Sequence, residues 1–242
     1  MADDTASLRI DLAAALRWAA RLGLHEGICN HFSVAASPSG DRFLVNPLGL
    51  HWSEIRASDL VLADAEGNVL EGAYEVEATA FFIHSRIHVR NPTARCVLHT
   101  HMPYATALTM VEGGRLEMVE QNALRFYDRI AYDDAYNGIA LDKAEGDRLA
   151  AALGNKSIAF LAAHGVIVSG PTIHQAFDDL YYLEKAAKLQ VLARSTRLPF
   201  RPIPDRVVRE TAASMHQDDS YPRRHFEALK RILDREEPEY RS

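Results

Sequence analysis

Two histidines one residue apart, His99 and His101, constrain this chain more than any other feature. They follow the run Ala-Arg-Cys-Val-Leu at positions 94–98, whose apolar content predicts a buried strand. Residues i and i+2 of a strand project to the same face. Both imidazoles therefore meet on one side of the predicted strand, at a spacing that suits a metal ion. The plainer interpretation is a pair of hydrogen-bonded histidines at a strand end.

A metal ion needs further ligands, and the chain offers Glu77 upstream and His164 downstream. Gly165 follows His164 directly, and a glycine there permits close backbone approach. Three imidazoles and one carboxylate suit Zn²⁺, and Mn²⁺, Co²⁺ and Fe²⁺ accept the same donors. Taken alone, His164 is read as a buried, hydrogen-bonded histidine and Glu77 as a solvated residue at a helix start.

Other residues compete for these roles. Glu75 is an alternative acid/base, but Glu77 begins a predicted helix, whose N-terminus favours an anion. His84 and His88 form an i, i+4 pair on the same helical face as Glu77. The sequence shows no third ligand of matching spacing for that pair, so we expect structural roles for both.

Composition excludes several classes of protein. The 242 residues carry a net charge of −6 and 48% are hydrophobic, an ordinary globular balance without a nucleic-acid-binding basic cluster. No apolar run approaches a membrane span, and the acidic first residues lack the layout of a signal peptide. We expect a soluble, cytoplasmic protein that binds neither nucleic acid nor membrane. Cys29 and Cys96 sit in apolar surroundings and are expected to be reduced and buried.

Periodicity and turn residues predict short strands mixed with helices in one α/β domain. Helices are expected at 7–22, 77–89, 103–111, 143–153, 172–194, 205–217 and 222–235, and strands at 32–34, 43–45, 60–62, 68–70, 94–98, 158–161 and 166–168. Residues 115–140 show no clear pattern. The hairpin at 60–70 indicates a partly antiparallel sheet. One domain should span 1–242, with 200–242 as a helical C-terminal extension.

The order of several motifs resembles the class II aldolase/adducin family over roughly residues 8–200. The matching pieces are the opening helix with its glycine loop, Asn46-Pro47-Leu48-Gly49, the helix beginning at Glu77, Pro92 leading into the histidine strand, and Ala163-His164-Gly165 with the segment 168–172. The resemblance implies a three-layer αβα sandwich around a mixed, mainly antiparallel central sheet. It also implies a homo-oligomer, commonly a tetramer, with active sites between subunits.

The resemblance assigns roles by motif position. Metal ligation falls to the three histidines His99, His101 and His164, and Glu77 is implied to be the catalytic acid/base and a potential fourth ligand. Family active sites also receive an aromatic side chain from a neighbouring subunit. Tyr127 is our first candidate for it and Tyr132 the second, although both can be ordinary core tyrosines.

The substrate-binding positions implied by the resemblance are Asn30, His31 and Gly49. Sugar-phosphate aldolases of the family hold phosphate with small polar residues in the first glycine loop and with a serine pair before the catalytic glutamate. Here residues 28–31 read Ile-Cys-Asn-His, and Glu75 and Val76 replace the serine pair. A carboxylate there repels phosphate. We therefore predict an unphosphorylated substrate whose carboxylate or hydroxyl meets His31, unless His31 only packs in its loop.

These observations favour a divalent-metal-dependent lyase that cleaves or forms a C–C bond in a small hydroxy-carbonyl or keto-acid compound. The reaction would pass through a metal-stabilised enolate, as in an aldolase or a related decarboxylase. Two alternatives remain. One is a non-catalytic, adducin-like binding or scaffold protein, against which the intact ligand set argues. The other is a metal-dependent epimerase, which usually needs the phosphate recognition that is weak here.

Overall fold

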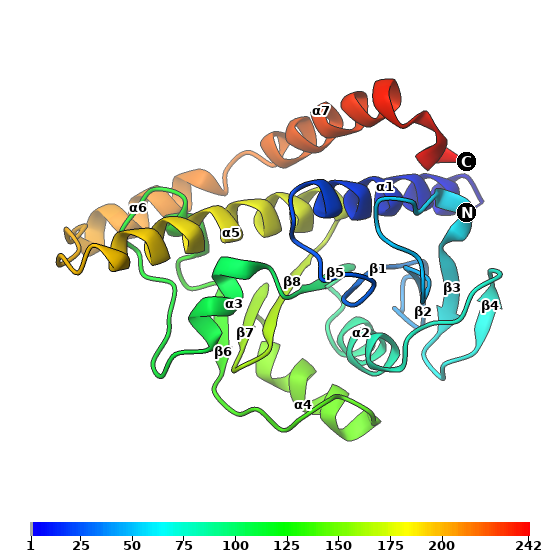
Figure 1. Ribbon diagram of the computed structural model, residues 1–242, viewed down its shortest axis with the longest axis horizontal. Coiled ribbons are helices and arrows are strands. Elements are labelled where there is room, and N and C mark those ends of the chain that lie inside the picture. Colours follow the sequence, from blue (N-terminus) through cyan, green and yellow to red (C-terminus); the bar gives the residue numbers. More distant parts are fainter. Residues whose placement is uncertain (1) are drawn as a thin grey trace.

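The computed structural model of the protein describes residues 2–242 and shows helices on both faces of one central sheet (Figure 1). The helices are α1 (Ala2–Arg21), α2 (Ala78–Arg90), α3 (Pro103–Thr109), α4 (Lys143–Leu153), α5 (Ile173–Ser195), α6 (Asp205–Met215) and α7 (Ser220–Glu236), with short 3₁₀ turns at Ala57–Asp59, Ala123–Phe126 and Pro238–Arg241. The strands are β1 (His31–Ala35), β2 (Arg42–Val45), β3 (Val61–Asp64), β4 (Val69–Glu71), β5 (Cys96–Thr100), β6 (Ile130–Asp133), β7 (Ile158–Leu161) and β8 (Gly165–Gly170).

The eight strands form a mixed, mainly antiparallel sheet in the order β4-β3-β2-β1-β5-β8-β7-β6. Only the edge pair β6–β7 is parallel. The predicted α/β class and mainly antiparallel sheet are thus confirmed. The histidine strand β5 lies in the middle of the sheet, between β1 and β8. Both of its edges are hydrogen-bonded, so the backbone that carries His99 is held from both sides.

Alternation along the central strands fills a core on each face of the sheet. Leu98 and Phe32 belong to the core beneath α1 and α5, whereas Val97 and Ile167 pack on the other side with residues of α2 and α4. His99 stands two residues after Val97 and therefore projects toward the α2 side. His31 is its direct cross-strand neighbour on β1, so both imidazoles are directed to the same face.

Several elements differ from expectation at their ends. α1 begins at Ala2 instead of residue 7, and α3 ends at Thr109, two residues early. The segment 115–140, for which no strand was predicted, contains β6. Residues 205–236 form the two expected helices; α7 packs along α5 and α1 (Figure 1). The C-terminal Tyr240 is fully buried, so this extension belongs to the main core.

The prediction for the cysteines was half wrong. Cys96 is buried in β5, and burial raises the pKa of its thiol above the ordinary range. Cys29 is exposed, because the loop that carries it is held by an isolated bridge to Glu26 at the surface. Apolar neighbours in the sequence do not bury a side chain whose backbone lies outside the sheet. Both thiols are free.

Candidate metal centre

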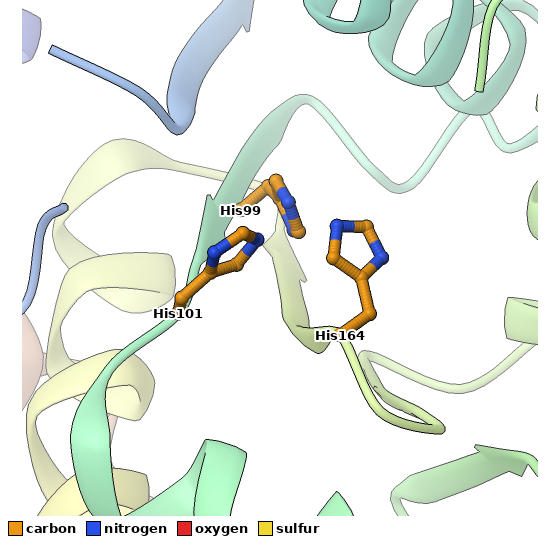
Figure 2. Close-up of side chains that lie close together, drawn as sticks. All are labelled: His99, His101 and His164. Atoms are coloured by element: carbon orange, nitrogen blue, oxygen red, sulfur yellow. The ribbon is translucent and has the colours of Figure 1, made fainter. Parts of the chain in front are cut away.

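Three histidines from two distant segments meet at one end of the central strands. His99 lies near the end of β5, His101 just after it, and His164 in the turn between β7 and β8. Ala163 makes this turn possible with a left-handed backbone, at a φ of 52°. One ligand nitrogen from each ring lies within 4.8 Å of the other two. Figure 2 shows the three rings facing a common space, an arrangement that suits one divalent ion.

Hydrogen bonds fix the orientation of two of these rings. His99 Nδ1 lies 3.0 Å from the carbonyl oxygen of Val166, and His101 Nδ1 lies 2.5 Å from Oε2 of Glu26. Both acceptors require a protonated Nδ1, which leaves Nε2 with its lone pair. His101 Nε2 is buried and has no hydrogen-bond partner among residues 2–242. Acceptors of this kind commonly orient histidines that ligate metals.

Burial favours the neutral form of two of these histidines, His99 and His164. Desolvation lowers the pKa of His99 well below its ordinary value, and the neighbouring His164 and His101 lower it further. Desolvation and the nearby His101 lower the pKa of His164 to about 4. A metal ion binds only the neutral imidazole. The two rings therefore stay ready for a metal at pH values where a solvent-exposed histidine would already be protonated.

Glu77 is not one of the grouped ligands, and its connection to them runs through His31, which stacks on His99. It is the N-cap of α2, where its Oε2 accepts a hydrogen bond from the Ala80 N–H at 3.0 Å and lies 3.1 Å from His31 Nε2. Partial burial raises the pKa of Glu77, but hydrogen bonds from His31, Thr79 and Ala80 outweigh it and lower the pKa to about 2. The carboxylate is therefore ionised at neutral pH.

Glu75, the competing acid, is exposed. Its carbonyl oxygen accepts a hydrogen bond from Leu48 N–H at 2.9 Å, which joins the Glu75 segment to the predicted turn at 46–49. Gly49 in that turn has a φ of 91° and is exposed. The turn and the segment before α2 thus lie side by side, and the substrate-binding role of Gly49 stays a prediction.

Asn30 contacts the backbone of His101, one of the three clustered histidines. Its φ of 74° is left-handed, a region that asparagine tolerates better than most residues. Its side-chain oxygen accepts a hydrogen bond from His101 N–H at 3.3 Å, and its own carbonyl accepts one from Asn46 Nδ2. The structure thus shows Asn30 holding His101, and its predicted contact with substrate stays a prediction.

The two tyrosine candidates differ in their surroundings. Tyr127 follows the 3₁₀ turn at 123–126 and is 39% exposed, so its side chain is available at the surface. Tyr132 lies on β6, where its hydroxyl accepts a hydrogen bond from Leu116 N–H and the Arg115 guanidinium covers its ring. Tyr132 is therefore engaged within its own chain. The role of Tyr127 in a neighbouring subunit stays a prediction.

His84 and His88 do not join the metal cluster. Both point from α2 to one serine hydroxyl on β1: Ser33 Oγ lies 2.6 Å from His84 Nδ1 and 2.7 Å from His88 Nε2. This agrees with the structural roles expected for the pair. Reasoning from the sequence missed both Ser33 and Glu26, the partner of His101. Glu26 is 75 residues from His101, and no local pattern connects them.

Comparisons with known proteins place the chain in a family. Residues 10–191 match the family model described as the class II aldolase and adducin N-terminal domain. The chain therefore belongs to the class II aldolase/adducin family. Across the described residues, no helix is long and apolar enough to cross a membrane.

Similar sequences include proteins named as aldolases and a protein named as an adducin. A provisionally named aldolase class 2 protein from Pseudomonas aeruginosa is 34% identical over 244 residues, covering 96% of this chain and 91% of that protein. Human beta-adducin is 34% identical over 170 residues, which cover 69% of this chain but only 23% of the adducin. The likeness to adducin is therefore confined to one part of that longer protein.

Similar solved structures agree over nearly the whole chain. An aldolase II superfamily protein from Pseudomonas syringae has a TM-score of 0.89 at 34% identity, covering 98% of this chain and 96% of that one. The L-fuculose 1-phosphate aldolase from Glaciozyma antarctica has a TM-score of 0.87 at 28% identity, covering 99% and 93%. The C-terminal helices are thus part of the shared architecture.

Proposed function

We propose that this chain is a divalent-metal-dependent lyase that cleaves or forms a C–C bond in a small hydroxy-carbonyl or keto-acid compound. One observation carries the proposal: three histidine rings converge on one space, and the outer nitrogens of two of them, His99 and His101, are tied to protein acceptors. Such a donor set suits Zn²⁺, and Mn²⁺, Co²⁺ or Fe²⁺ would also be accepted. A non-catalytic scaffold has no need of this arrangement.

In this proposal, different residues bind the metal, transfer the proton and position the carboxylate. His99, His101 and His164 would hold the ion, which when bound supplies Lewis-acid stabilisation of developing negative charge on a substrate oxygen. Glu77 is ionised and connected to the cluster through His31, so it can accept a proton from the substrate and return it. His31 donates to this carboxylate and keeps it in place. The same groups serve an aldolase or a decarboxylase, because both reactions develop charge at the same oxygen.

Two glutamates flank the start of α2, and they give a matched test of the base. Glu77→Gln keeps a hydrogen-bonding N-cap but loses the ionised group, so turnover should fall by about 10²–10⁴-fold, the usual value of general acid/base catalysis. Glu75→Gln is the control, since that side chain is exposed. By elemental analysis, Glu77→Gln should keep the fold and at least part of the metal, and Glu75→Gln should keep all of it. A small loss of turnover in Glu77→Gln together with a large loss in Glu75→Gln would contradict the assignment of Glu77 as the base.

The substrate is proposed to be unphosphorylated. Glu77 is a fixed anion connected to the cluster through His31, Glu75 adds a second carboxylate two residues away, and the glycine loop offers Cys29 and His31 where phosphate-binding residues are expected. The similar protein from Glaciozyma antarctica is named for a phosphorylated sugar. A phosphorylated substrate is therefore the competing possibility, and one comparison of substrates separates it from this proposal. Matched substrates with and without phosphate should differ in kcat/KM in favour of the unphosphorylated one. A tenfold preference for phosphate, about 1.4 kcal/mol of transition-state binding, would overturn this proposal.

The proposal also covers the oligomeric state of the protein and its location in the cell. We infer that the chain forms a homo-oligomer in the cytoplasm, with a tetramer the expected state. Tyr127 would then reach a neighbour's site from its exposed position. Light scattering gives the oligomeric state, and Tyr127→Phe separates the hydroxyl from the ring. Loss of turnover with the assembly and metal intact would support a catalytic hydroxyl.

A further inference from the structure

A second group of polar side chains lies behind the metal cluster and has no part in metal binding. It consists of His31 and Ser33 on β1 and His84 and His88 on α2. His31 stacks on His99 with ring centres 6.0 Å apart, and His84 meets His31 edge to face at 5.8 Å. All four side chains are buried, and His84 is completely inaccessible. Buried polar groups of this kind need a complete set of hydrogen bonds.

The positions of the protons in this group follow from its far end. His88 Nδ1 lies 2.8 Å from the carbonyl oxygen of Ala94, which can only accept, so His88 Nδ1 carries a proton. Burial lowers the pKa of His88 to about 4, and the ring is neutral near pH 7. His88 Nε2 is therefore an acceptor, and the Ser33 hydroxyl donates its single proton to it.

The ring nitrogen of His84 that carries a proton follows from the partners of Ser33. Since the hydroxyl proton of Ser33 is already used, its oxygen can only accept from His84, and His84 Nδ1 must carry a proton. Burial lowers the pKa of His84 well below its ordinary value, so this ring is neutral too. His84 Nε2 is thus left with a lone pair. It is buried, and no donor for it exists among residues 2–242.

His31 has a matching buried ring nitrogen. Its Nε2 faces the ionised carboxylate of Glu77 and so carries a proton. Its Nδ1 is also buried without a partner in the described chain. Two neighbouring imidazoles therefore each leave one buried ring nitrogen without a hydrogen-bond partner. A buried acceptor left unsatisfied costs about 1–3 kcal/mol.

We propose that Ser33, His84 and His88 form a proton-ordered chain that presents a fixed acceptor to the His31–Glu77 pair, and that one water molecule completes it. The water donates one hydrogen to His84 Nε2 and the other to His31 Nδ1. With its Nδ1 occupied, His31 is locked in the tautomer whose Nε2–H donates to Glu77. Ser33, His84 and His88 are thus positioning residues for the carboxylate, and only the purpose of that positioning rests on the proposed function.

The tautomers can be read directly by long-range ¹H–¹⁵N NMR of the ¹⁵N-labelled metal-loaded protein. We expect His84 and His88 to be protonated at Nδ1 and His31 at Nε2. A crystal structure at high resolution should show one water oxygen within about 3.2 Å of His84 Nε2 and His31 Nδ1. Protonation of His84 at Nε2, or an empty position between the two rings, would overturn the proposal, and neither result bears on whether the protein is a lyase.

A pair of serine variants tests the chain as a unit. Ser33→Ala removes the hydroxyl that orders it, so the His84 signal should change to a mixture of tautomers while metal content stays full. Ser53→Ala is the matched control, because Ser53 Oγ lies 2.7 Å from the Nδ1 of His51, an exposed histidine outside this group. It should leave the other histidine signals unchanged. An unchanged His84 signal in Ser33→Ala would refute the chain; if that variant does not fold, the wild-type tautomers still decide.

Discussion

Gly165 begins β8 directly against the segment that carries Thr100 and His101, and this contact leaves no room for a side chain. A Cβ at this position would stand 2.6 Å from the carbonyl oxygen of Thr100 and 2.7 Å from Cδ2 of the His101 ring. Ordinary contact begins at 3.4 Å, so the strand or the ring would have to move by about 0.8 Å. Metal–ligand distances tolerate only about 0.2 Å. Gly165→Ala should therefore weaken metal binding as well as folding.

The expected magnitude follows from overpacking, which typically costs about 1–3 kcal/mol. Gly170→Ala is the control on the same strand: its Cβ would meet Ala176 N at 3.2 Å, and neither glycine has a left-handed backbone. Urea unfolding should show the larger loss of stability for Gly165→Ala, and elemental analysis should show metal loss approaching that of His99→Ala. Full metal occupancy with stability within about 0.5 kcal/mol of wild type would refute this reasoning.

Two further results are expected. Glu26→Gln removes the carboxylate that orients His101 and should weaken metal affinity by about 10–100-fold in a chelator competition assay; unchanged affinity would mean that the contact does not orient the ring. The pKa of His88 is about 4 when folded and near 6.5 when unfolded, so the unfolded chain binds more protons between these values, and stability is lost as pH falls from 6.5 to 4. His88 alone accounts for a loss of about 3 kcal/mol in the free energy of unfolding over this pH range. In urea unfolding measured at several pH values, His88→Gln should show a shallower pH dependence than wild type. Parallel curves for the two proteins would contradict the lowered pKa of His88.

Local patterns determined much of this protein. The helical periods placed α2, α4 and α5 close to their observed ends, and turn residues marked the hairpin of β3 and β4. The His99–His101 spacing predicted two rings on one side because strand geometry has a fixed period of two. His164 followed from motif order, and it does join them. Apart from His164, which followed from the order of motifs, each of these features depends on residues that are neighbours in the chain.

Residues far apart in the chain required the tertiary structure. β6 is a four-residue edge strand that pairs with the parallel strand β7, and all four of its residues are half-buried, so it carries no alternation to detect. Cys29 proved exposed although its sequence neighbours are apolar, because burial depends on which backbone joins the sheet. Glu26 meets His101 across 75 residues, and Ser33 meets His84 across 51.

The sequence by itself therefore determined the residue types of the candidate ligands, the α/β class and the family, since periodicity and the order of motifs can be read along the chain. Only the tertiary structure decided which acceptors orient the histidines, that Glu77 caps its own helix while meeting His31, and where the protons of the buried histidines lie. The physical reason is that the direction of a hydrogen bond depends on every partner around an atom. Those partners come together only when β1, β5, β8 and α2 pack.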